Sequence, residues 1–185
     1  MRAQRGDEAG AREALAVVDD RLLSFGMDSP AGLAALAYLE LAQPDEALRR
    51  CDTTVATHRR AGSAFVGVAL VETLSTMGAW ERLTAILPTS RALANVMKLL
   101  RPVSDRAEGR MRAERGEHGD ALRLLEAALD GFEALGLPFE AARTRERLAS
   151  LAAPDAARAL LESSLATYAD LRAAPHADRV RSLLG

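Results

Sequence analysis

Residues 112–125 read RAERGEHGDALRLL, and residues 2–15 read RAQRGDEAGAREAL. The two segments share two arginines, two alanines, a glycine and a leucine at matching positions, so Ala11 and Leu15 correspond to Ala121 and Leu125. Three further segments follow the same pattern, and the five anchor residues are regularly spaced, with intervals of 36, 36, 38 and 36: Ala11, Ala47, Leu83, Ala121 and Ala157. A fixed period of this length is typical of helical hairpins stacked into an array, an α-solenoid.

Apolar residues recur at helical spacing along nearly the whole chain, and no segment shows the alternation of β-branched residues expected of a strand. Glycines and prolines separate the apolar segments, as where Gly136 and Pro138 follow 119–135. The pattern predicts helices over about 8–25, 30–42, 45–60, 64–77, 79–87, 90–100, 103–115, 118–135, 139–151, 155–171 and 175–184. Short connections make neighbouring helices antiparallel, so we expect an all-α chain of about five helical hairpins.

The segment 79–102 interrupts the regular spacing. Pro88 is expected to end the helix that begins near Trp80, and an additional helix at 90–100 is expected before Pro102. This insertion would explain why the interval between Leu83 and Ala121 is longer than the others, and it would kink the array. No linker marks a boundary, so we expect one repeat domain over residues 1–185.

The residues at the hairpin positions resemble those of tetratricopeptide (TPR) repeats. Gly109 stands in the middle of a first helix, Gly116 at the turn, and Ala121, Leu125 and Ala128 on the second helix, as that family favours. Small residues let two helices approach closely, while the bulky one fills the gap between hairpins. The resemblance implies a TPR-like right-handed superhelix of antiparallel helical hairpins.

The segment 119–184 is similar to the C-terminal repeats of bacterial LuxR-type, MalT-like ATPase regulators and of ATPase-coupled nucleotide cyclases. This resemblance implies a sensor or protein-interaction arm of a bacterial transcriptional regulator or signalling protein. No glycine-rich loop leads to Lys98, the only lysine, so the chain has no phosphate-binding P-loop. Residues 2–6 correspond to the end of a first helix, from which we expect a fragment of a larger protein or a homodimer formed through this end.

Composition narrows the classes of partner and compartment. The net charge of −2 favours neither nucleic acid nor an anionic membrane as a direct partner. No apolar run reaches transmembrane length. A single cysteine, Cys51, excludes an internal disulfide and fits a reducing cytoplasm.

No group of residues in the sequence predicts catalysis, a cofactor or a metal. Cys51 and His58 share a helix face, but two ligands without a third make a poor zinc site. Cys51 also occupies the position of the bulky leucine in other repeats, which favours burial. The carboxylates stand at helix starts and on polar faces. We therefore expect a protein that is not an enzyme.

In TPR arrays the first helix of each repeat lines a concave groove, and the resemblance therefore implies a protein or peptide partner there. The corresponding positions in this chain are Leu36, Phe65, Val68, Glu72, Arg106, Arg110, Phe139, Ala142 and Glu146. Aromatic side chains would anchor a partner and charged ones would orient it. Alternatively, Phe65 and Phe139 pack into the neighbouring hairpin, as residues just after a turn often do.

Arginines are concentrated in one part of the sequence, at Arg101, Arg106, Arg110, Arg112 and Arg115. Interleaved acidic residues at helical spacing favour a solvated, salt-bridged face, and the alternative is an anion-binding stripe. A solvated face predicts that Arg106→Ala costs little stability.

Two other functions stay open. The chain is a small-molecule-sensing regulatory arm if a ligand binds near Trp80 and Arg106 in the irregular segment. It is a self-assembly module if it dimerises through its N-terminal end.

Overall fold

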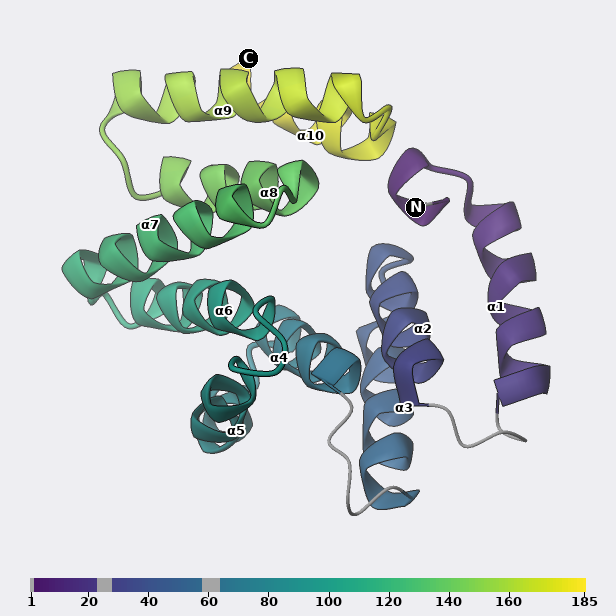
Figure 1. The fold of residues 1–185 in the computed structure, drawn as a ribbon. Coiled ribbons are helices and arrows are strands. Elements are labelled where there is room, and N and C mark those ends of the chain that lie inside the picture. The colour runs from purple at the N-terminus through teal and green to yellow at the C-terminus, as the bar shows by residue number, and fades with distance from the viewer. Residues whose placement is uncertain (1, 23–27, 58–63) are drawn as a thin grey trace. The chain divides into compact units, whose positions relative to one another are not determined.

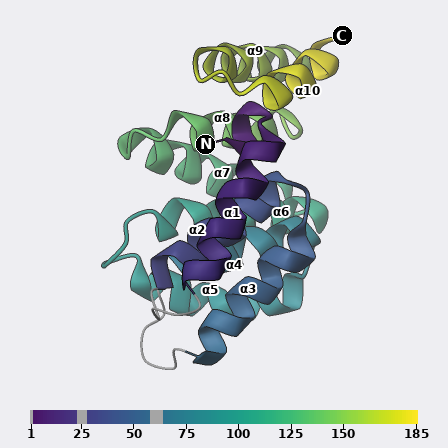
Figure 2. The same ribbon diagram turned by 90° about the vertical axis from the view of Figure 1, so that its right-hand side faces the viewer.

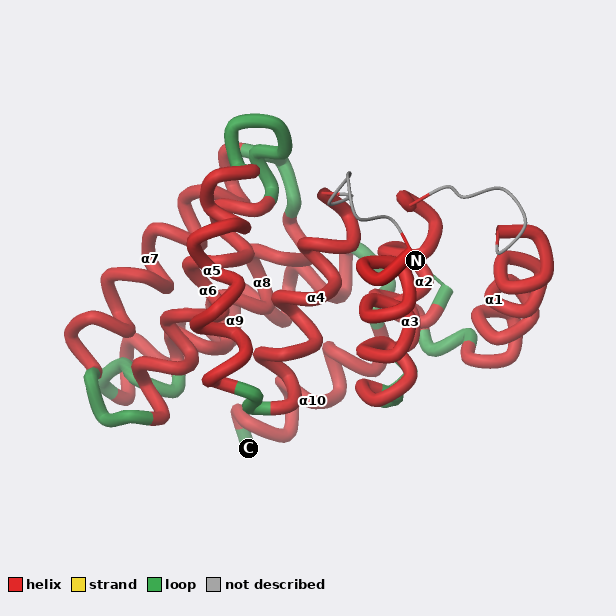
Figure 3. Tube along the Cα trace, turned by 90° about the horizontal axis from the view of Figure 1, so that it is seen from below, coloured by secondary structure: helices red, strands yellow, loops and turns green. Residues whose placement is uncertain are grey.

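The computed structural model describes residues 2–22, 28–57 and 64–185, and within these ranges it contains helices and turns but no strand (Figure 3). A short 3-10 helix, Ala3–Arg5, precedes ten α-helices. Their bounds are α1 Glu8–Leu22, α2 Asp28–Glu40, α3 Pro44–Thr57, α4 Ala64–Met77, α5 Trp80–Leu93, α6 Leu100–Glu114, α7 His118–Ala134, α8 Pro138–Ala149, α9 Pro154–Asp170 and α10 Ala174–Leu184. The expected all-helical class is therefore confirmed for the described residues.

Internal contacts divide the chain into two compact units. The first comprises Met1–Ala3 and Asp7–Leu100, and the second comprises Gln4–Gly6 and Arg101–Gly185. The boundary after Leu100 falls within the segment 79–102, where the repeat spacing is irregular. The two units are described separately below.

In the first unit, α2 packs against α1, α3 and α4 (Figures 1 and 2). Because α2 is covered on several sides, its sequence is apolar around most of its circumference. Gly32 of α2 lies against the backbone of Phe65, and a Cβ added there would come within 2.5 Å of the Phe65 carbonyl carbon. The absence of a side chain at residue 32 thus brings α2 and α4 close together.

In the second unit, α7 packs against α8, α8 against α9, and α9 against α10 (Figure 1). Gly109 lets α6 approach α7, because a Cβ at this position would lie 2.9 Å from Cγ of Leu125. Leu125 is 1% exposed. The pairing of a small residue with a bulky one, expected from the sequence at these two positions, is confirmed.

One turn geometry recurs six times among the described residues. A residue with positive φ follows the helix end, and the next N–H donates a hydrogen bond to the carbonyl five positions earlier. The donor–acceptor pairs are Asp7–Arg2, Gln43–Tyr38, Ala79–Leu74, Glu117–Arg112, Leu137–Phe132 and Ala173–Tyr168, with N···O distances of 2.9–3.1 Å. The first four of these turns repeat at the same spacing as the anchors Ala11, Ala47, Leu83 and Ala121.

The anchor residues of the repeats form much of the core. Ala11, Ala47, Leu83 and Ala121 are buried, and Ala157 is half-buried. Cys51 is 1% exposed and packs among residues of α2 and α4, as expected from its position in the repeat.

The expected helix break at Pro88 is wrong. A single helix, α5, continues through Pro88 to Leu93, and residues 94–99 form turns instead of belonging to a helix at 90–100. The next helix begins at Leu100 and contains Pro102 in its first turn, where proline is tolerated.

The burial pattern of α5 explains this correction. Leu83, Leu87 and Ser90 lie on one buried face, and a continuous helix keeps all three in the core. Pro88 is exposed, so the Thr84 carbonyl that loses its helical hydrogen bond lies on the accessible side of the helix. Burial of the apolar face thus outweighs the loss of one hydrogen bond.

Some sequence-based expectations concern residues outside the described ranges, among them Gly26, His58 and Gly62. None of the helices in the described part of the chain is both long and apolar enough to cross a membrane.

Candidate functional site

Four arginines from two helices form what is called here the arginine cluster. Arg106 and Arg110 lie one turn apart on α6, and Arg143 and Arg147 lie one turn apart on α8. The charges of the other three all act on Arg147, so the four guanidinium groups occupy one neighbourhood. All four belong to the second compact unit.

Arg106 is the inner member of the cluster and is only 6% exposed. Its guanidinium donates to the Glu140 carboxylate at 2.5 Å, to the Glu140 carbonyl at 3.1 Å and to Thr144 Oγ1 at 3.3 Å. It also lies over the ring of Phe132, 4.5 Å from the centroid. The expectation that Arg106 occupies a solvated face is therefore corrected, because its charge is satisfied inside the protein.

Glu140 supplies the negative charge beneath the cluster. Burial opposes its ionisation, but the positive charges of Arg106 and Arg143 outweigh burial and hold the pKa of Glu140 below its ordinary value. Glu140 therefore stays ionised at neutral pH. Its carboxylate already forms ion pairs with Arg106 at 2.5 Å and with Arg143 at 3.7 Å.

Arg147 is the outer member, and among the described residues it has no ion-pair partner. Its side chain is exposed, yet desolvation, followed by the charges of Arg110 and Arg143, lowers its pKa below the ordinary value for arginine. The charges that act on Arg147 are thus mostly positive, and a surface of this kind attracts anions.

A second group of polar side chains borders the cluster, and its charges are paired. Glu146 of α8 accepts hydrogen bonds from Tyr168 at 2.5 Å and from Arg179 at 2.8 and 2.9 Å. Burial, and then the hydrogen bond to Glu146, raises the pKa of Tyr168. The Tyr168 ring meets Phe139 edge to face at 5.5 Å and His176 at 5.2 Å. This group locks α8, α9 and α10 together.

The structure distributes the nine predicted groove residues between the two units. Leu36, Phe65, Val68 and Glu72 belong to the first unit, and the other five belong to the second.

Within the second unit, the structure brings Arg106, Arg110 and Glu146 into or beside the arginine cluster. Phe139 is half-buried against Tyr168 and His176, which fits the alternative of packing into the neighbouring hairpin. Ala142 is fully buried and has only a packing role.

Within the first unit, Val68 and Glu72 are buried, at 3% and 7% exposure. Leu36 is half-buried against the core around Ala35 and Cys51. Phe65 is half-buried beside Gly32.

Sequence reasoning missed Arg143 and Arg147. The arginines that it singled out lie between residues 101 and 115, on α6 and the turn after it, whereas the cluster combines two of them with two from α8. The positions of Arg110 and Arg147 differ by about one repeat. Positions one repeat apart on successive first helices are neighbours in a stacked array, so a search at this spacing would have found the pair.

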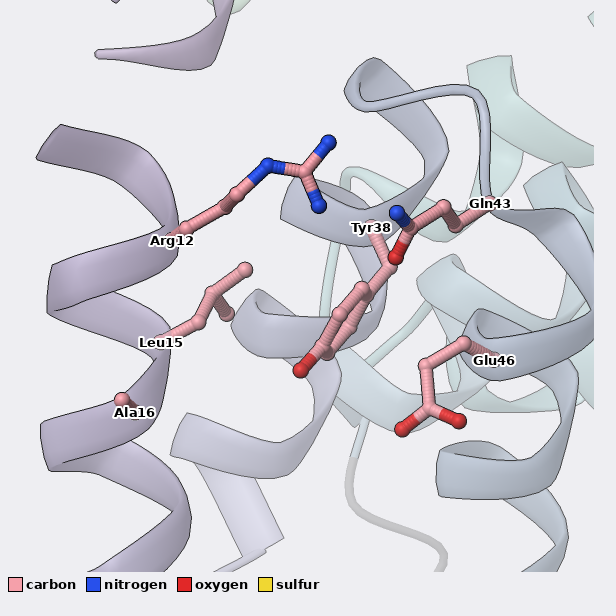
Figure 4. Close-up of a pocket in the computed structure, with 6 residues that line it drawn as sticks. All are labelled: Arg12, Leu15, Ala16, Tyr38, Gln43 and Glu46. Carbon is pink, nitrogen blue, oxygen red and sulfur yellow. The ribbon is translucent and has the colours of Figure 1, made fainter. Parts of the chain in front are cut away.

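A separate hollow of about 430 Å³ lies among α1, α2 and α3 in the first unit. Figure 4 shows Arg12 and Leu15 extending from α1 towards Tyr38, Gln43 and Glu46. The Glu46 carboxylate is already satisfied, because hydrogen bonds from two arginines on α3 outweigh partial burial and lower its pKa to about 2. The hollow therefore has less unpaired charge to offer a ligand than the arginine cluster.

The surroundings of the Cys51 thiol oppose its ionisation. Burial, together with the negative charge of Asp52, raises the pKa of the Cys51 thiol to about 12, so it is not a nucleophile at neutral pH. His58 lies outside the described residues, so the structure does not address its pairing with Cys51.

Comparison of the chain with protein-family models, curated proteins and solved structures returned no match. The candidate site is therefore defined by its own residues. It is the arginine cluster, in which Arg106 is paired with Glu140 and the charges of Arg106, Arg110 and Arg143 act on Arg147.

Proposed function

We propose that this chain is a non-enzymatic, TPR-like scaffold that binds a protein or peptide partner. Two features of the described residues support the TPR-like arrangement. The same turn recurs at the spacing of the sequence repeat, and Gly32 and Gly109 lie where neighbouring helices approach closely. Right-handed stacking of about five such hairpins is part of this proposal.

The partner is an acidic segment that lies across α6, α8 and α10. The observation that carries this proposal is Arg147, an arginine without an ion-pair partner among the described residues, on which the charges of three other arginines and only one carboxylate, Glu146, act. An acidic segment would relieve this repulsion and gain charge-assisted hydrogen bonds. The half-buried ring of Phe139 offers an apolar contact beside the charges.

The resemblance of 119–184 to the repeats of bacterial regulators supports a role as the sensor or interaction arm of a transcriptional regulator or signalling protein. In this role the scaffold transmits the presence of its partner and performs no reaction itself. A cytoplasmic location belongs to the same proposal.

The test is fluorescence anisotropy with a labelled glutamate-rich peptide and a neutral peptide of equal length. We expect the acidic peptide to bind the wild type and the Arg110→Gln/Arg147→Gln variant to bind it at least tenfold more weakly. The matched control is Arg123→Gln/Arg158→Gln, two exposed arginines on α7 and α9. Binding that is equal for both peptides, or equal in both variants, would refute the proposal.

A small-molecule-sensing function is the second candidate, and the hollow beside α1 favours it. Arg12 and Gln43 supply hydrogen-bond donors there, and Leu15 and Tyr38 supply apolar surface (Figure 4). A metabolite that raises the unfolding temperature of the wild type, and not of a Leu15→Arg variant that fills the hollow, would establish this function.

Self-association is a further proposal, to which the exposed Val17 on α1 lends an apolar contact. Light scattering over a concentration series decides it, because a dimer would gain mass with concentration while a monomer would remain at 19.8 kDa.

A further inference from the structure

The hollow beside α1 lies among three helices that have counterparts later in the chain. The helices α1, α2 and α3 begin 110 residues before α7, α8 and α9 respectively, as from Glu8 to His118. Every residue that lines the hollow therefore has a counterpart 110 positions further along the chain. Comparison of the two sets shows which features of the lining are particular to the first unit.

The counterparts are mostly apolar, whereas the residues around the hollow are mostly polar. Arg12 and Tyr38 correspond to Leu122 and Leu148, and Leu148 is only 5% exposed. The other polar lining residues correspond to alanines: Gln43 and Glu46. The second unit thus has leucines where the first has hydrogen-bonding groups around a space of about 430 Å³. Polar groups that converge on a space of this size are typical of a ligand site and not of a packed core.

Two hydrogen-bond donors reach the hollow. The Arg12 side chain extends into it from α1, and the Gln43 amide extends towards it from the residue before α3 (Figure 4). Arg12 forms an ion pair with Glu8 at 3.7 Å, and the two side chains are 52% and 69% exposed. A long, exposed pair of this kind contributes little to stability, so Arg12 can exchange it for a ligand.

The acidic residue of the lining is not open to a cationic ligand. Glu46 accepts hydrogen bonds from Arg49 at 2.6 and 2.9 Å and from Arg50 at 2.8 Å. Arg50 also lies over the Tyr38 ring, 5.2 Å from its centroid. These contacts fix the carboxylate against α3. A ligand amine would therefore have to displace an arginine, whereas an anion meets the exposed guanidinium of Arg12.

We propose that this hollow binds a small carboxylic acid with an apolar body and no amino group. The carboxylate lies between Arg12 and Gln43, and the body packs on Leu15, Ala16 and the Tyr38 ring. This inference rests on the second function proposed above, small-molecule sensing, and names the class of ligand.

The number of donors favours a carboxylate over a phosphoryl group. A guanidinium fork satisfies the two oxygens of a carboxylate, and an amide N–H adds one further hydrogen bond. A phosphoryl group offers three oxygens and more negative charge than one arginine balances. The apolar side of the hollow also requires a ligand with a hydrocarbon part, which inorganic anions lack.

The first arm of the test uses phenylacetate as the probe. Backbone amide resonances are followed by NMR during titration at pH 7 and constant ionic strength. We expect saturable shifts in α1 and in the turn before α3, and at least tenfold weaker binding of phenylacetamide, phenethylamine and inorganic phosphate. Shifts that do not saturate, or binding of any of these three as tight as that of phenylacetate, would overturn the proposal.

Arg12→Gln tests the anchor of the carboxylate. It should weaken phenylacetate binding roughly tenfold and leave the weak binding of phenylacetamide unchanged. The matched control is Arg158→Gln, because Arg158 forms an exposed pair of the same spacing with Glu162 at 3.9 Å. Circular dichroism establishes that both variants are folded. An equal affinity of Arg12→Gln and Arg158→Gln for phenylacetate would contradict the anchor.

Gln43→Ala provides an independent test, because it introduces the residue of the counterpart position, Ala153. Loss of one uncharged hydrogen bond should weaken phenylacetate binding about fivefold, less than loss of the guanidinium. An unchanged affinity would mean that the carboxylate does not reach the turn before α3.

The second arm separates the ligand class from the sensing function. Unfolding temperatures with a panel of metabolites are compared among the wild type, Leu15→Arg and Arg12→Gln. Stabilisation by acids alone, lost in both variants, supports the function and the ligand class. Stabilisation by uncharged or cationic metabolites, lost only in Leu15→Arg, supports the function and overturns the ligand class. Saturable phenylacetate binding without any stabilising metabolite supports the ligand class and contradicts the function.

Discussion

The hairpins α6/α7 and α8/α9 follow one another along the chain, and their residues correspond at the spacing of the sequence pattern. Phe132 and Tyr168 correspond, and both are fully buried. The residues Arg110 and Glu146 also correspond, but they carry opposite charges. Glu146 is neutralised by Arg179, whereas Arg110 adds to a group of arginines. The same position thus carries a paired carboxylate in one hairpin and an additional arginine of the cluster in the other.

The largest expected difference between the two hairpins concerns their central leucines. Leu125 is 1% exposed and lies against Gly109, so Leu125→Ala should cost about 4 kcal/mol. Its counterpart Leu161 is only half-buried, and Leu161→Ala should cost about 1–2 kcal/mol. Urea denaturation measures both. Equal losses would mean that the two hairpins are packed alike.

The buried ion pair has the next largest expected effect. Arg106→Ala should cost about 3 kcal/mol, because it leaves the Glu140 carboxylate without its principal partner. The exposed Arg123→Ala should change stability by less than about 0.5 kcal/mol. Chemical denaturation at pH 7 compares the two, and a loss as small for Arg106 as for Arg123 would place Arg106 on a solvated face after all.

The same pair has a defined pH dependence. The pKa of Glu140 is lowered in the folded state. The ionised carboxylate therefore contributes to the free energy of unfolding above the unfolded pKa of about 4.3, and this contribution is lost as the pH falls through the folded pKa. The deficit of Arg106→Ala should therefore shrink below about pH 4. A deficit that is constant from pH 7 to pH 3 would show that the charge of Glu140 is not involved.

Tyr168→Phe makes the second hairpin resemble the first at this position. The hydroxyl donates to Glu146, which keeps its hydrogen bonds to Arg179 when the hydroxyl is removed. We therefore expect a loss of only about 1 kcal/mol, measured by thermal denaturation. A loss above about 3 kcal/mol would mean that Arg179 alone does not satisfy Glu146.

The turns that end the two hairpins differ in one residue. Gly136 has φ of 64°, and Arg172 adopts φ of 55° at the corresponding position. A side chain in this region is strained, so Arg172→Gly should stabilise the protein by up to about 1 kcal/mol, and Gly136→Ala should destabilise it by about as much. Melting temperatures of the two variants should shift in opposite directions, and shifts of the same sign would contradict the assigned turn geometry.

The smallest expected effect is at Arg147 of the arginine cluster. Arg147→Gln removes a charge that Arg110 and Arg143 repel, so stability should stay the same or rise by up to about 0.5 kcal/mol while anion binding falls. Denaturation at low and at high salt checks this, because salt screens the repulsion and should abolish the gain. A clear loss of stability at low salt would show that Arg147 has a structural role.

Much of the helical framework could be predicted from local pattern. Helix positions, the turn glycines and the burial of Cys51 and Leu125 follow from apolar spacing and from the preference of glycine for positive φ. The predicted helix end at Pro88 was wrong, because the preference of proline for helix starts does not take account of the buried face that continues through α5. The predicted solvated position of Arg106 was also wrong, since the helical spacing of charges does not reveal which neighbouring helix covers them.

The sequence by itself determined that the described part of this protein is helical, because the spacing of small and apolar residues is a local property of the chain. Only the tertiary structure decided which arginines meet. Arg110 and Arg147 belong to different helices, and their proximity depends on how α6 and α8 pack. It also decided which charges are neutralised, since an ion pair forms only where a carboxylate is brought within reach, as Glu140 is for Arg106 and as no described residue is for Arg147.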